Sequence, residues 1–163
     1  MLKATLGSLP ASVQFIAIDF NAGSWQSALR ASGYDPDRRT LFIWEGVTNY
    51  LTEDAVDRTL RWCARAAPGS RVLFTYVHAQ VLDQPQAFAR TERLFATLSA
   101  AGERWTFGLN PASLHSFLAQ RGLVLEADVG ASEYRARYFG RPADRMRGYE
   151  FYRIAVARVP GHG

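Results

Sequence analysis

The chain has 163 residues, enough for one domain with a buried core, and its 48% hydrophobic and 21% charged residues are ordinary values for a globular protein. No apolar run approaches the roughly 18 residues of a membrane-spanning helix, and the N-terminus lacks the apolar stretch of a secretory signal. A lone Cys63 excludes an internal disulfide and a cysteine-based zinc site, and no His, Cys, Asp and Glu spacing indicates another metal. We therefore expect a cytoplasmic protein that forms one domain over residues 1–163.

The positive charge raises the question of a nucleic-acid partner. The net charge is +4 and the isoelectric point is near 9.6. The arginines are scattered along the chain, which is more typical of a solvated surface than of a dedicated binding face. We do not favour a nucleic-acid partner, although an RNA-directed protein remains a third option. The densest arginine stretch, residues 135–147, is kept as a candidate for anionic ligands.

Five apolar or β-branched segments predict strands, and segments at helical spacing separate most of them. The strands are expected over residues 13–18, 41–44, 71–77, 123–129 and 152–159. Residues 41–44 form a continuous apolar run of the kind that is buried on both faces of a parallel sheet. Helices are expected over residues 25–31, from the cap Thr52 to about 66, over 86–101, and from Asn110 and Pro111 to Gly122.

The alternation of strands and helices predicts an α/β fold with a doubly wound parallel sheet. The last connection, residues 130–150, shows no convincing helical pattern. A parallel crossover usually contains a helix, so an irregular connection there is also compatible with an antiparallel final strand. No repeat, low-complexity tract or linker divides the chain.

Two strand ends carry candidate site residues, because ligands of open α/β sheets bind beyond the carboxyl ends of the strands. Asp19 and Phe20 follow the first predicted strand, where a carboxylate can accept from an amine or a ribose hydroxyl and an aromatic ring can pack on a purine. Alternatively, Asp19 caps the following turn. Glu45 and Gly46 follow the buried run 41–44, where glycine permits close approach of a ligand. Here the alternative is a plain turn in which Glu45 pairs with an arginine.

Other residues are weaker candidates. His78 follows a strand end and could act as an acid–base group, although a surface or loop histidine is the simpler interpretation. Arg135, Arg137 and Tyr138 could form part of a lid over an acceptor, or they belong to a solvated loop.

The stretch Phe-Ile-Trp-Glu-Gly-Val-Thr-Asn-Tyr-Leu-Thr, residues 42–52, closely resembles the signature after the fourth strand in the leucine carboxyl methyltransferase-like family. Residues 13–21, 105–111 and 150–158 are similar to the same family in the same order. The resemblance implies a class I methyltransferase (Rossmann-like) fold and an S-adenosylmethionine-dependent O-methyltransferase acting on a small-molecule hydroxyl or carboxylate.

The resemblance also implies residue roles. Asp19 and Phe20 would flank the adenine of S-adenosyl-L-methionine, and Glu45 and Gly46 would lie beside its methionine part or sulfonium. Tyr50 would face the methyl-transfer pocket, where aromatic faces attract a cation. The enzyme would mainly align the acceptor oxygen with the methyl group and exclude water.

The same resemblance leads us to expect that the chain is the C-terminal part of a methyltransferase domain. A family member carries a first strand, a glycine-rich turn and a second strand before residue 13, and Gly7 is the lone glycine there. Without these two strands the strand at Phe42 would have an open edge, which a missing N-terminal segment or a homodimer partner would complete. An alternative function follows: a catalytically inactive remnant that acts as a binding or oligomerisation module.

Overall fold

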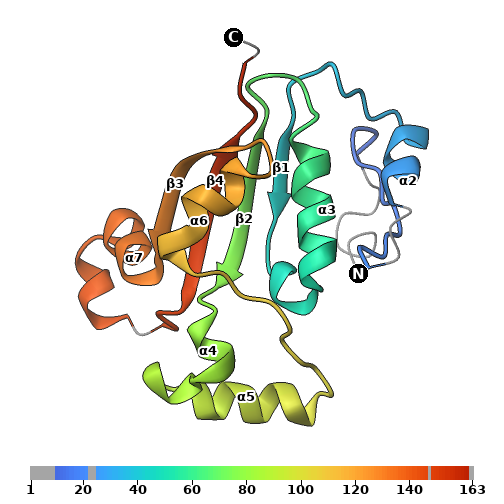
Figure 1. Ribbon diagram of the computed structural model, residues 1–163. Helices are drawn as coiled ribbons and strands as arrows, with labels where there is room; N and C mark the ends of the chain where they lie inside the picture. The colour runs from blue at the N-terminus through green and yellow to red at the C-terminus, as the bar shows by residue number, and fades with distance from the viewer. Residues whose placement is uncertain (1–9, 22–24, 147, 162–163) are drawn as a thin grey trace. The chain divides into compact units, whose positions relative to one another are not determined.

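The computed structural model describes residues 10–21, 25–146 and 148–161, which form two compact units (Figure 1). The boundary between the units lies between Asp35 and Pro36. Among the described residues, no helix is both long and apolar enough to cross a membrane.

The first unit contains helix α2, Trp25–Ala31, as predicted from the sequence. Its buried residue is Trp25, whose ring centroid lies 5.5 Å from that of Phe20. Gly33 follows the helix in the left-handed region, at φ +88, and its N–H donates to the Arg30 carbonyl.

The prediction of a strand over residues 13–18 is wrong. No described residue pairs with this segment, and the side chains of Val13 and Phe15 are 44% and 65% exposed. A β-branched segment forms a strand only where a neighbouring strand pairs with its backbone N–H and C=O groups. The composition of the segment does not reveal whether such a neighbour exists.

The second unit is built on a four-stranded sheet with the order β1-β2-β4-β3. The strands are β1, Leu41–Trp44; β2, Arg71–Val77; β3, Val124–Gly130; and β4, Tyr152–Arg158. β1 and β2 are parallel, whereas β4 runs antiparallel to both β2 and β3. The four strands predicted here are therefore confirmed, and the last one runs antiparallel to its neighbours, one of the two arrangements that the sequence left open.

Helices α3, Glu53–Cys63, and α6, Leu114–Ala119, cover one face of this sheet (Figure 1). The core of that face consists of fully buried side chains from the helices and from the central strands, among them Leu60, Leu118, Phe74 and Ala155. Asn110 starts the α6 segment as predicted, because its side chain accepts from the Ala112 N–H at 3.0 Å.

The other face of the sheet is less covered than the sequence predicts. Leu41 and Ile43 are 58% and 65% exposed, and Trp44 alone of the four residues of β1 is buried. The expectation that residues 41–44 are buried on both faces is therefore wrong. β1 forms one edge of the four-stranded sheet, so only β2 pairs with it among the described strands.

Two connections also differ from the sequence prediction. The helix expected over residues 86–101 is shorter: α5 covers Thr91–Ala100, a 3-10 turn, Pro85–Ala87, stands before it, and a separate short helix, α4, Gln80–Asp83, precedes that turn. Phe88 is extended, at φ −119 and ψ 138, which ends the 3-10 turn, and Arg90 takes a left-handed conformation, φ 68, directly before α5. Residues 130–150, expected to lack a helix, contain α7, Ala131–Phe139, and a 3-10 segment, Arg141–Arg145. Glu133 and Arg137 form an i,i+4 ion pair along α7.

The cap of α3 gives a direct stability test. The Thr52 side chain accepts from the Ala55 N–H at 3.2 Å, so Thr52→Ala should lower the free energy of unfolding by about 1 kcal/mol in urea denaturation. Thr97→Ala on α5 is the control. The Thr97 hydroxyl only donates back to the Arg93 carbonyl, and its loss should leave stability unchanged or slightly raised. Equal effects of the two substitutions would contradict a capping role.

Candidate active site

A cavity of about 520 Å³ lies at the edge of the sheet where β1, β2 and β3 end and β4 begins. Glu45 and Gly46 line it after β1, Thr75 within β2, and Val129 and Gly130 at the end of β3. The opposite wall comes from α7 and from the segment leading into β4, and its lining residues are Tyr134, Arg135, Phe139, Tyr149, Tyr152 and Arg153. This position is the usual one for a ligand of an open α/β sheet.

The turn after β1 is held against β2 by two short hydrogen bonds. The Gly46 N–H donates to Thr75 Oγ1 at 2.7 Å, and Thr48 Oγ1 donates to the Thr75 carbonyl at 2.7 Å. Gly46 has φ +69, which favours glycine, and no atom lies within 4 Å of the position that a Cβ would take there. The turn is therefore rigid and leaves open space beside its backbone.

Glu45 is an exposed carboxylate at the rim of the cavity. The arginine partner that the sequence left open as an alternative is absent from the described ranges, where no ion pair of Glu45 is found. A cationic ligand would therefore meet a carboxylate that has no protein counterion in this part of the chain.

A polar network supports the β4 side of the cavity. Arg153 Nε and Nη2 donate to both oxygens of Asp128, at 2.9 to 3.1 Å, and Nε also donates to the Tyr76 hydroxyl at 3.0 Å. Tyr76 in turn donates to Asp128 Oδ1 at 2.9 Å. The hydrogen bond to Asp128 raises the pKa of Arg153, and burial raises the pKa of Tyr76 well above its ordinary value. Both groups keep their protons across the physiological range, and the Arg153 side chain is fixed.

Comparison with known sequences connects this chain to methyltransferases. A model of the leucine carboxyl methyltransferase family matches residues 1–64. A candidate S-adenosyl-L-methionine-dependent methyltransferase of Mycolicibacterium vanbaalenii is 36% identical over 124 residues, and one of Mycobacterium avium is 33% identical over 150 residues. Over residues 1–64 the chain is thus similar to the leucine carboxyl methyltransferase family, and over most of its length it is similar to S-adenosyl-L-methionine-dependent methyltransferases. The two matches cover 75% and 91% of this chain but 40% and 46% of the relatives, so the chain spans less than half of their length.

Solved structures show the same fold. A candidate methyltransferase from Thermobifida fusca has a TM-score of 0.63 and 19% sequence identity, with 98% of this chain and 58% of that chain covered. An S-adenosylmethionine-dependent methyltransferase from Mesorhizobium loti has a TM-score of 0.50 and 15% identity, with 85% of this chain and 77% of that chain covered. The expected α/β fold of class I methyltransferases is therefore confirmed.

The remaining predicted site residues lie in three places. Asp19 and Phe20 belong to the first unit, where Asp19 Oδ1 accepts from the Asn21 N–H at 2.9 Å, the local turn that the sequence left open as an alternative. Tyr50 and His78 belong to the second unit but do not line the 520 Å³ cavity. Arg137 is half exposed, Tyr138 is 66% exposed, and neither contributes to the lining.

The hydrogen bonds of Tyr50 and His78 restrict what each can do. The Tyr50 hydroxyl donates to Glu103 Oε2 at 2.8 Å. His78 Nδ1 accepts from the Gln80 N–H at 3.1 Å, which assigns the proton of the neutral ring to Nε2. Burial and the nearby charge of Arg153 lower the pKa of His78, so the imidazole is neutral at pH 7.

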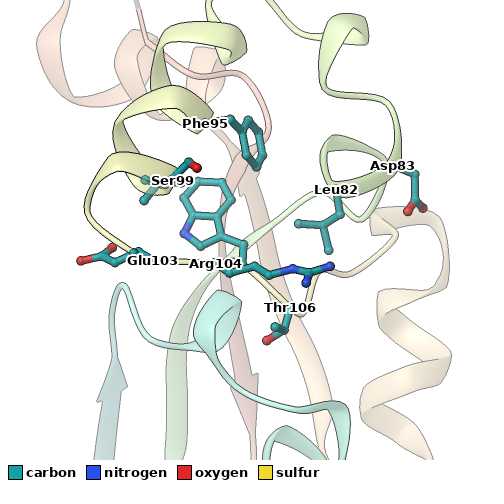
Figure 2. Close-up of a pocket in the computed structure, with 10 residues that line it drawn as sticks. Leu82, Asp83, Phe95, Ser99, Glu103, Arg104 and Thr106 are labelled. Carbon is teal, nitrogen blue, oxygen red and sulfur yellow. The ribbon is translucent and has the colours of Figure 1, made fainter.

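A second cavity, of about 690 Å³, lies between α4, α5 and the segment that follows α5 (Figure 2). Glu103, which accepts the hydrogen bond of Tyr50, lines this second cavity. In Figure 2 the Leu82 and Phe95 side chains point into the middle of this cavity, whereas the Glu103 and Asp83 carboxylates lie at opposite ends. Within the described ranges, no cluster of three or more His, Cys, Asp or Glu residues could hold a metal ion in either place.

The sequence names Arg135, Arg137 and Tyr138 as part of a lid over an acceptor. Of these three, Arg135 lines the first cavity, together with Tyr134 and Phe139 of α7, whereas Arg137 and Tyr138 do not. The sequence shows no helical pattern in this segment, so it did not indicate Tyr134 and Phe139. Arg153 was also missed, since its role depends on the pairing of β4.

The aromatic wall of the cavity predicts a pH dependence. Burial, with smaller contributions from Tyr50 and Tyr149, raises the pKa of Tyr152 from 10.0 to about 12. The unfolded chain releases this proton near pH 10 and the folded chain does not, so Tyr152 stabilises the fold below pH 10 and loses that contribution as the pH rises toward 12. Urea denaturation at pH 8 and pH 11 should show a smaller alkaline loss for Tyr152→Phe than for the unsubstituted chain. Tyr138→Phe, which removes the hydroxyl of an exposed tyrosine, should behave like the unsubstituted chain, and a Tyr152→Phe loss as large as theirs would contradict the assignment.

Proposed function

We propose that this chain binds S-adenosyl-L-methionine at the Glu45 end of the 520 Å³ cavity and functions as part of an O-methyltransferase. The enzyme would act on a small-molecule hydroxyl or carboxylate. Similarity to the leucine carboxyl methyltransferase family and to S-adenosyl-L-methionine-dependent methyltransferases supports the proposal. The single observation that carries it is the Glu45–Gly46 turn, an open backbone surface with an exposed carboxylate at the mouth of the cavity.

The residues present fit this cofactor. Its sulfonium is a cation, which the Glu45 carboxylate would attract, and the tyrosines of the far wall present faces that add cation–π attraction. The open space beside Gly46 lets a ligand approach the backbone closely. When bound, the cofactor supplies an activated methyl group. The protein's part is to hold the acceptor oxygen in line with that group and to exclude water, and the mainly apolar lining suits both tasks.

Other residues keep roles within the proposal. The roles of Asp19 and Phe20 at the adenine stay predictions from the resemblance, and the acid–base role of His78 stays a prediction from its place after a strand. To take a proton, His78 would have to use Nδ1, which accepts from the Gln80 N–H. Tyr50 is proposed to act from the methyl-transfer side, with its hydroxyl oriented by Glu103. Arg137 and Tyr138, on the outer side of α7, are proposed to meet the part of the acceptor that extends beyond the cavity.

Calorimetric titration of the chain with S-adenosyl-L-methionine tests the proposal. We expect binding, and Glu45→Gln should weaken it about fivefold, the effect of about 1 kcal/mol for a charge contact at a solvated rim. Glu92→Gln on α5 removes the same charge from an exposed position outside this cavity and should leave the affinity unchanged. Absence of binding, or equal effects of the two substitutions, would overturn the cofactor site.

A second function has one observation in its favour. Leu41 and Ile43 present exposed apolar side chains on β1, at an edge of the four-stranded sheet, as a binding or oligomerisation module would. Sedimentation of the chain together with the titration separates the two functions. A concentration-dependent dimer without cofactor binding would support the module, whereas cofactor binding by a monomer would reject it.

A further inference from the structure

Two arginines on the far wall of the 520 Å³ cavity have similar surroundings. Arg153 and Arg135 both line the cavity, and each is paired with a carboxylate that does not: Asp128 for Arg153 and Glu150 for Arg135. The Arg135 side chain is 14% exposed and that of Arg153 is 25% exposed. Each guanidinium is thus fixed by a carboxylate that lies outside the lining, and each arginine contributes to the lining itself.

The unused donors of both arginines lie against glycines. A Cβ added to Gly130 would lie 3.0 Å from Arg153 Nη1, and one added to Gly148 would lie 2.8 Å from Arg135 Nη1. Both glycines line the same cavity. Among the described residues, neither Nη1 group has a hydrogen-bond partner, because Asp128 takes Nε and Nη2 of Arg153 and Glu150 takes Nη2 of Arg135. A guanidinium held in this way can accept a second anion through its remaining N–H groups.

The space in front of these donors is lined by aromatic rings. The rings of Tyr134 and Phe139 meet edge to face at 5.8 Å, and those of Tyr149 and Tyr152 at 6.3 Å. Such a lining favours a flat, unsaturated ligand over a flexible aliphatic one, since ring–ring contacts add to simple burial.

The two ends of the cavity differ in charge. Glu45 follows β1, and Arg153 lies near the start of β4. Because β2 lies between these two strands, the two ends of the cavity are two strand spacings apart, about 10 Å in total. An anionic ligand group is repelled at the Glu45 end and attracted at the arginine end. We infer that the methyl acceptor is a hydroxylated aromatic acid, with its carboxylate on Arg135 and Arg153 and its hydroxyl toward Glu45. The inference rests on the proposed function and names the substrate class of the same site.

Binding of 4-hydroxybenzoate, measured by calorimetry, tests the inference, with the neutral 4-hydroxybenzamide as the matched ligand. We expect the acid to bind at least tenfold more tightly than the amide, as charge-assisted hydrogen bonds of about 1.5 kcal/mol or more would give. Arg135→Gln should remove most of this difference. Arg65→Gln, which removes an exposed arginine outside the cavity, is the control and should preserve it.

The possible results separate this inference from the proposed function. Equal binding of acid and amide, no binding of either, or equal effects of Arg135→Gln and Arg65→Gln would overturn the aromatic-acid site while leaving the cofactor titration untouched. A different result is that the acid binds in an Arg135-dependent way but the chain does not bind S-adenosyl-L-methionine. That result would overturn the proposed function, and with it the role of the acid as a methyl acceptor. Circular dichroism of the Arg135→Gln chain should match that of the unsubstituted chain.

Discussion

The antiparallel pairing of β4 between β2 and β3 is the constraint on which the second unit depends. It places Arg153 opposite Tyr76 in one strand pair and opposite Gly130 in the other, within reach of the Asp128 carboxylate. A partly buried guanidinium needs a counterion and hydrogen-bond acceptors, and two neighbouring strands supply them here: Asp128 of β3 accepts from Nε and Nη2, and Tyr76 of β2 accepts from Nε. The pairing also brings the start of β4 to the same edge as the ends of β1, β2 and β3, where the cavity forms.

The two walls of the cavity are held by different means. On one wall, Thr75 binds the turn after β1 through its hydroxyl and its carbonyl, so that Gly46 keeps its left-handed backbone and Glu45 remains at the rim. On the other wall, α7 and the start of β4 supply aromatic rings and paired arginines. A carboxylate thus faces cationic donors across an apolar space, which orients a ligand that carries both kinds of group and keeps water away from its centre.

Those elements whose patterns are local could be predicted from the sequence. Residues 41–44, 71–77, 123–129 and 152–159 are apolar runs bounded by turns, and Thr52 and Asn110 cap their helices as side chains of their type do. Residues 13–18 have the same composition but no strand partner among the described residues, and α7 has tyrosines and arginines where an apolar stripe would reveal a helix. In the site, Glu45 and Gly46 could be found because they directly follow a strand, and Arg135 could be named because it lies in the densest arginine stretch. Arg153 could not be found, because its importance arises from strand pairing across a bulge at Leu125 and Ala127 and from Gly130, which is distant in sequence.

The central claim is that the cavity at the ends of β1, β2 and β3 receives the cofactor. Amide chemical shifts of the isotopically labelled chain, followed by NMR during titration with S-adenosyl-L-methionine, test it most directly. The account predicts saturable shifts of the Gly46, Thr75 and Gly130 amides, which line this cavity, with little change in α5. Shifts confined to the cavity beside α5, or no shifts at all, would contradict it.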